Sequence, residues 1–149
     1  MEGYYCFGGI DPRRTELPDS VKVLVKENKT SFSWRTLDCK GKKPAGRMFH
    51  SLEYHPGLQS LILYGGKDKN ENILGGIYAL NLQSLNWVYV KIVGESIHRP
   101  RAGHDSLIFG SQLWIAGGST SDNTRQSFLS RFELGIDFDW IHPPLNVNS

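Results

Sequence analysis

The sequence predicts an all-β protein built from tandem four-stranded antiparallel sheets, and three observations carry this prediction. Gly-Gly pairs end three short apolar segments, at Gly8-Gly9, Gly65-Gly66 and Gly117-Gly118. Tryptophans follow these pairs 53 residues apart, at Trp34, Trp87 and Trp140. An Arg-x-x-His motif recurs after 54 residues, at Arg47 to His50 and Arg101 to His104. Three landmarks with one order and nearly one period identify an internal repeat.

Each period reads as strands because apolar and β-branched segments alternate with turn signals and no 3.6-residue period is evident. In the central period the turns fall at His55–Gln59 and Gln83–Asn86, and strands are expected at Ser51–Tyr54, Ser60–Tyr64, Ile77–Leu82 and Trp87–Ile92. The following period repeats this order, with strands expected at Ser106–Phe109, Gln112–Ala116, Phe128–Leu134 and Phe138–Ile141.

These residues resemble the kelch family, whose repeats of about 50 residues each build one four-stranded blade of a β-propeller. The matching features are Gly-Gly closing the second strand, Trp in the fourth strand, and Arg-x-x-His leading into the first, from Tyr4 to about Ile141. The family often places a Tyr seven residues before the Trp, where this chain has Glu27, Leu80 and Glu133.

The resemblance implies a partial kelch-type β-propeller of four-stranded antiparallel blades. We expect one kelch-repeat region over 1–149, with blades at approximately 1–40 (partial), 45–95 and 99–142 and a tail at 143–149.

The repeated residues have structural roles in this interpretation. Glycine pairs adopt positive φ and let backbones approach closely as a strand leaves its sheet. Trp34, Trp87 and Trp140 are expected to fill the gaps between neighbouring blades. The side chains of Arg47, His50, Arg101 and His104 are expected to hydrogen-bond loop backbone where the chain crosses to the next blade.

About two and a half blades cannot close a ring, since propellers contain four to eight. Exposed strand edges and apolar blade faces would favour aggregation. Three explanations are open: the chain is a piece of a larger protein, it completes a propeller with another chain, or it is an open stack capped by partners.

The composition is that of a globular chain, with 39% hydrophobic and 21% charged residues and a net charge of +2 among 149 residues. This charge is too small to indicate nucleic-acid binding. We expect no signal peptide, because the N-terminus has no basic segment followed by a long apolar one. Two cysteines, Cys6 and Cys39, are too few for a disulfide framework. We expect a cytoplasmic protein, with cytoskeletal or ciliary association suggested by family analogy alone.

No catalytic or metal site is expected, and no cofactor. The five histidines are His50, His55, His98, His104 and His142, and they form no zinc-type pair. Some kelch-like proteins are metalloenzymes, but the convergent ligand sets that these enzymes use are not evident here.

The long loops after each Gly-Gly and each Trp strand are expected to share one face, where a protein partner binds. Its basic side chains are candidates for contacting an acidic partner: Arg13, Arg14, Lys40, Lys42, Lys43, Arg47, Arg99 and Arg101. The sequence therefore predicts a non-enzymatic protein-interaction module, a scaffold or subunit of a larger assembly, with a partner that completes or caps the propeller. The alternatives are the substrate-recognition part of a ubiquitin-ligase adaptor and a fragment of a kelch-type metalloenzyme.

Overall fold

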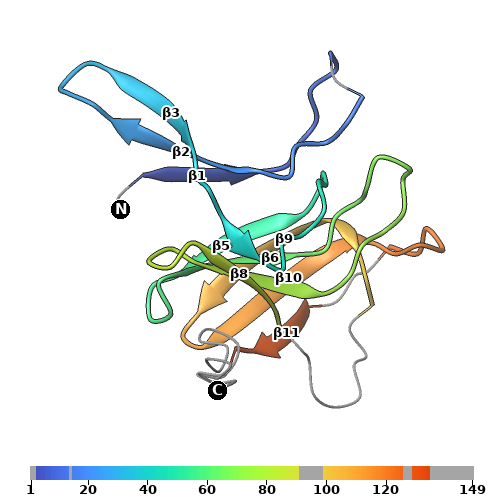
Figure 1. Ribbon diagram of the computed structural model, residues 1–149. Coiled ribbons are helices and arrows are strands. Elements are labelled where there is room, and N and C mark those ends of the chain that lie inside the picture. The colour runs from blue at the N-terminus through green and yellow to red at the C-terminus, as the bar shows by residue number, and fades with distance from the viewer. Residues whose placement is uncertain (1–2, 14, 91–98, 126–128, 135–149) are drawn as a thin grey trace, which may run out of the picture.

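The computed structural model describes residues 3–13, 15–90, 99–125 and 129–134, and this part of the chain is all-β. The strands form three sheets that follow one another along the chain (Figure 1). The first sheet has the order β1-β2-β3, and its strands are β1 (Tyr4–Phe7), β2 (Val21–Lys26) and β3 (Phe32–Thr36). The expected all-β fold class with antiparallel sheets is confirmed.

The middle sheet is the most complete, with the order β4-β8-β7-β6-β5. Its strands are β4 (Lys40–Gly41), β5 (Ser51–His55), β6 (Ser60–Tyr64), β7 (Ile77–Asn81) and β8 (Asn86–Val90). All pairings are antiparallel except that of β4 with β8, which is parallel. The four strands predicted for this period are therefore present, and β4 is an addition that the sequence pattern did not indicate.

The third sheet has the order β11-β10-β9, and its strands are β9 (Ala102–Phe109), β10 (Gln112–Ser119) and β11 (Leu129–Glu133). Two of these strands are longer than predicted: β9 begins before Ser106, and β10 continues past Ala116 through the Gly-Gly pair. The strand expected at Phe138–Ile141, the tail at 143–149, Trp140 and Arg14 lie outside the described residues.

The middle sheet is covered on both faces. Successive side chains of a strand point to opposite faces, yet all five residues of β6 are buried. Leu61 and Leu63 pack with Phe7 and Val21 of the first sheet. On the other face, Ile62, Tyr64, Ile77 and Ala79 pack with the third sheet through Leu113, Ile115, Phe132 and Leu134. The hydrophobic core thus consists of two layers, one on each side of the middle sheet.

The two described tryptophans of the repeat differ in their surroundings. Trp87 is 1% exposed, and its ring centroid lies 5.8 Å from that of Phe7 on the first sheet. Trp34, at the equivalent position on β3, is 56% exposed. The prediction that Trp34 fills a gap between blades is wrong for this structure, because no described sheet covers that face of the first sheet.

Candidate functional site

Arg47 links the first sheet to the middle sheet. Its backbone carbonyl accepts a hydrogen bond of 2.8 Å from the Gly9 N–H at the end of β1. Its guanidinium donates to the carbonyls of Gly65 and Ala45, both at 3.0 Å. Since the side chain is only 2% exposed, Arg47 ties two Gly-Gly segments together from the interior.

Arg101 makes the same link one repeat later. Its carbonyl accepts from the Gly66 N–H at 2.9 Å, and its guanidinium donates to the Gly117 carbonyl at 3.2 Å and to Ser130 Oγ at 3.2 Å. It is 0% exposed. Arg47 and Arg101 were candidates for contacting a partner as well as for backbone binding. Burial excludes the first role for both side chains.

The glycine pairs are required by this arrangement. Gly65 has a φ of +66°, and a Cβ placed on it would lie 2.4 Å from the Arg101 carbonyl oxygen. Gly8 has a φ of +63°, and its Cβ would lie 2.2 Å from the Arg47 carbonyl oxygen. Any other residue would both strain the backbone and displace the Arg carbonyl.

His50 and His104 lie beside these glycines and are uncharged at neutral pH. Burial, with the nearby Arg47 guanidinium, lowers the pKa of His50 to about 4. Burial lowers the pKa of His104 to about 4, and the nearby charges of Arg101 and His50 contribute to the shift. His104 Nε2 lies 3.0 Å from Ser51 Oγ on the neighbouring sheet, and its ring packs edge-on against Tyr64 at 5.2 Å. Both histidines therefore contact the junction between sheets.

The basic run Lys40–Lys43 does not lie among the long loops. The Lys40 N–H donates to the Leu85 carbonyl in the short turn before β8, and the Lys42 N–H donates to the Trp87 carbonyl. Lys42 Nζ sits 5.2 Å from the centroid of the Tyr89 ring. The run thus follows the outer edge of the middle sheet, because β4 pairs with β8. Its expected place on the long-loop face is corrected accordingly.

The other described basic candidates are exposed and paired with acids. Arg13 Nε lies 3.1 Å from Asp11 Oδ1, and Arg99 Nη1 lies 3.7 Å from Asp122 Oδ2. In both of these exposed pairs a neighbouring carboxylate offsets the positive charge.

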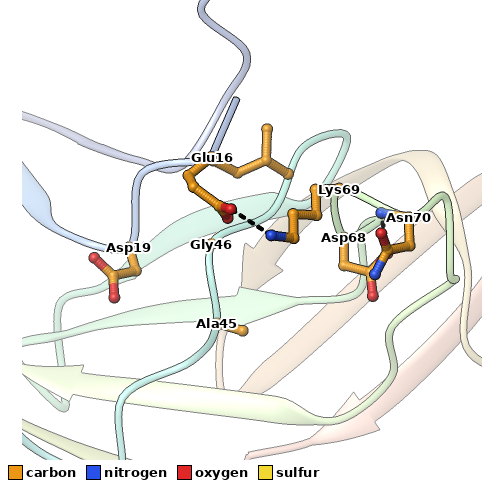
Figure 2. A pocket seen from close by; sticks show the side chains of 8 residues that line it. Glu16, Asp19, Ala45, Gly46, Asp68, Lys69 and Asn70 are labelled. Carbon is orange, nitrogen blue, oxygen red and sulfur yellow. Dashed lines mark hydrogen bonds and ion pairs between the residues drawn. The ribbon is translucent and has the colours of Figure 1, made fainter. Parts of the chain in front are cut away.

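A pocket of about 470 Å³ opens between the loops of the first and middle sheets (Figure 2). We call it the acidic pocket. The carboxylates of Glu16, Asp19 and Asp68 line it together with a single ammonium, Lys69, which pairs with Glu16 across the two loops. The remaining lining residues are Leu17, Ala45, Gly46 and Asn70.

The loop that carries Asp68 is held by its own hydrogen bonds. Asp68 Oδ1 accepts from the N–H groups of Asn70 and Asn72 at 2.8 and 2.9 Å, and the Asp68 N–H donates to the Asn72 carbonyl. Hydrogen bonds to the carboxylate lower the pKa of Asp68, chiefly the bond of 2.8 Å that the Asn72 side-chain amide donates to Asp68 Oδ2. The carboxylate is ionised at neutral pH, and its position in the pocket is fixed by the turn.

A second pocket, of about 460 Å³, repeats this arrangement between the middle and third sheets. It lies between the loops that follow Gly65-Gly66 and Gly117-Gly118. The Thr120 N–H donates to the Thr124 carbonyl as Asp68 does to Asn72, and Asn123 has the positive φ of its counterpart Glu71. Its lining residues are Lys67, Glu71, Asn72, Ile73, Thr120, Ser121 and Asn123.

Sequence reasoning missed the acidic pocket. It located the long loops but singled out only the basic side chains on them. The signal that could have found the pocket is positional, since Asp68 follows a Gly-Gly pair by two residues.

The described residues contain no group of three or more His, Cys, Asp or Glu side chains placed to hold a metal ion. They also contain no helix long and apolar enough to cross a membrane.

Comparison with known proteins matches residues 2–148 to the model of the KLHDC2/KLHL20/DRC7 Kelch-repeats domain. The chain is 26% identical to the host cell factor homolog hcf-1 of Caenorhabditis elegans over 88% of its length and 19% of the relative. It is 30% identical to acyl-CoA-binding domain-containing protein 5 of Arabidopsis thaliana, over 75% of this chain and 16% of the relative. It is 27% identical to the bovine (Bos taurus) Rab9 effector protein with kelch motifs, over 80% and 31%. The chain thus spans less than a third of each of these relatives.

Proposed function

Because this chain belongs to the kelch-repeat family, we propose that it is a non-enzymatic protein-interaction module that holds a segment of its partner on the long-loop face. In this role it is a scaffold or subunit of a larger assembly. The repeated pockets between adjacent sheets carry the proposal, since they recur at equivalent positions on one face.

The charges of the acidic pocket favour a partner segment that carries lysine or arginine. The lining contains three carboxylates and one ammonium, and Lys69 is already paired with Glu16. This reverses the acidic partner expected from the sequence, because the basic run lies along the outer edge of β8. Exposed charges attract weakly, by about 1 kcal/mol per pair at most, so the affinity also requires contacts between the peptide backbone and the loops.

The test measures fluorescence anisotropy of a labelled Gly/Ser peptide containing three arginines, with a triple-glutamate peptide of the same length as comparison. We expect the cationic peptide to bind more tightly, and the preference to weaken as salt screens the charges. Asp19→Lys should weaken binding roughly fivefold, because it changes the local charge by two units at a cost of about 1 kcal/mol.

The matched control is Asp38→Lys, which makes the same charge change at an exposed residue that does not line the pocket. Equal affinity for the two peptides would exclude the acidic pocket as the binding site, as would equal losses in the two variants.

A further inference from the structure

The outer face of the first sheet presents a row of large apolar side chains. Tyr4 pairs with Leu24, and Leu24 pairs with Trp34, so these three residues lie side by side on one face. Tyr4 is 78% exposed and Trp34 is 56% exposed. The equivalent row of the middle sheet, Leu61, Leu80 and Trp87, is no more than 3% exposed, because the first sheet covers it. The first sheet therefore presents a surface of the kind that another sheet covers elsewhere in the molecule.

The outer face of the third sheet is its counterpart at the other end. Leu107 pairs with Trp114, and these residues occupy the positions of Glu53 and Ile62 in the middle sheet. Leu107 and Leu129 are 53% and 58% exposed, and Phe109, two residues after Leu107 on the same face, is 72% exposed. Ile77, the equivalent of Leu129, is buried against the third sheet. Six of the ten exposed large hydrophobic side chains of the described residues lie on the two outer faces: Tyr4, Phe32, Trp34, Leu107, Phe109 and Leu129.

The two faces also differ in net charge: the first sheet carries two lysines, and the third carries two carboxylates beside Arg131, which lies over the Trp114 ring. On the first sheet, exposed Lys22 lies opposite Cys6, and exposed Lys26 is paired with Phe32 near the β2–β3 turn. On the third sheet, exposed Asp105 lies opposite Ala116. Ala116 occupies the position of Phe7, which is next to Cys6, so Asp105 lies at nearly the same height along its strand as Lys22.

The second acidic residue of the third sheet lies at the other end of the strands. Exposed Glu133 is paired with Gln112, beside the β9–β10 turn. Stacked as the first sheet stacks on the middle sheet, the third sheet of one copy would bring Glu133 towards Lys26 of another, and Asp105 would lie at the height of Lys22.

From these features we propose that two copies of this chain associate head to tail, the outer face of the third sheet of each covering the outer face of the first sheet of the other. Each contact repeats the order of the sheet-to-sheet contacts already inside the chain. The described strands of two copies form six sheets, and propeller rings close with four to eight. A head-to-tail contact that closes after two copies gives a finite dimer, whereas one that does not close gives filaments. This dimer rests on the proposed function in one respect, because a second copy is the partner in the proposed assembly. It does not depend on the acidic pocket.

The first test is the molar mass of the full chain in solution, by light scattering after size exclusion. We expect twice the chain mass of 16.8 kDa. Trp34→Glu and Leu107→Glu, one on each face, should each raise the dimer Kd at least about tenfold, because large apolar residues at interface centres contribute most of the binding energy. Both residues are more than half exposed, so far-UV circular dichroism should be unchanged.

The control is Ile10→Glu, which places the same charge on a residue that is 67% exposed and lies outside both faces. A mixture of the Trp34→Glu and Leu107→Glu chains should form a dimer again, since it restores one of the two contacts. In the same way, Lys26→Glu should weaken the dimer, and adding Glu133→Lys to that chain should restore it.

A monomeric wild-type chain, open filaments, or a dimer that Ile10→Glu weakens as much as Trp34→Glu would overturn the proposal. So would stable association with an unrelated chain in place of a second copy. Binding of the tri-arginine peptide by the monomeric Trp34→Glu chain reports on the acidic pocket separately, so failure of one proposal is distinguishable from failure of the other.

Discussion

Replacing Trp87 with alanine should destabilise the chain much more than the same replacement at Trp34, although the two residues occupy equivalent positions. Trp87 is 1% exposed, so its truncation removes about 200 Å² of buried surface, or about 5 kcal/mol at ~25 cal/mol per Å². Measured costs for a buried aromatic residue, about 3–5 kcal/mol, agree with this figure. Trp34 is 56% exposed, which lowers the corresponding figure to about 2 kcal/mol and leaves no enclosed cavity. The expected difference is about 3 kcal/mol.

Urea unfolding followed by far-UV circular dichroism measures this difference without relying on tryptophan fluorescence. With a urea dependence of about 2 kcal/mol per molar, the midpoint of Trp87→Ala should fall about 1.5 M below that of Trp34→Ala. The experiment is done at low chain concentration, so that self-association does not contribute. If the two variants lose the same free energy of unfolding within about 1 kcal/mol, the conclusion that coverage by the first sheet makes Trp87 contribute more to stability than Trp34 is refuted.

Two more predictions concern the junction between sheets. Gly65→Ala should destabilise the chain strongly in urea unfolding. Gly103 has the same φ of +66° but nothing within 4 Å of an added Cβ, so Gly103→Ala should cost only about 1–2 kcal/mol, the cost of the left-handed conformation. Equal losses in the two variants would show that the close approach of Gly65 to the Arg101 carbonyl is unimportant. Since the pKa values of His50 and His104 are lowered from 6.5 to about 4 in the folded chain, the unfolded chain takes up protons first as pH falls. Their contribution to the free energy of unfolding is therefore complete above pH 6.5 and is lost between pH 6.5 and 4. A His50→Gln, His104→Gln double variant should lose less of its free energy of unfolding over that range. A loss equal to that of the unchanged chain would count against burial of the neutral rings.

The parts of the fold that the sequence predicted are those set by local chemistry. A Gly-Gly pair after an apolar segment predicts a strand that ends at positive φ, and Gly65 and Gly66 have φ values of +66° and +100°. The turns at His55–Gln59 and Gln83–Asn86 fix the strands on either side of them. These features depend on residues within a few positions, so one repeat is sufficient to identify them.

The features that the sequence did not predict depend on segments far apart in the chain. Whether a tryptophan is buried depends on a neighbouring sheet, which Trp87 has and Trp34 lacks among the described residues. The two residues of β4 carry no periodic signal, and their pairing with β8 moved the lysines of that segment to the sheet edge. The acidic pocket joins Glu16 to Asp68, and no local pattern indicates that pairing.

Alternation along the strands distinguishes the middle of the stack from its first sheet. All five residues of β6 are buried, whereas β2 alternates between buried Val21 and Val23 and exposed Lys22. Because polar and apolar residues alternate along β2, the outer face of the first sheet can remain in contact with water. Contact between two first sheets would bring the lysines of both copies together, whereas the outer face of the third sheet carries Arg131 as well as its two carboxylates. Like charges across an interface oppose association. The lysines that keep the outer face of the first sheet hydrated therefore also favour the head-to-tail order over contact between two first sheets.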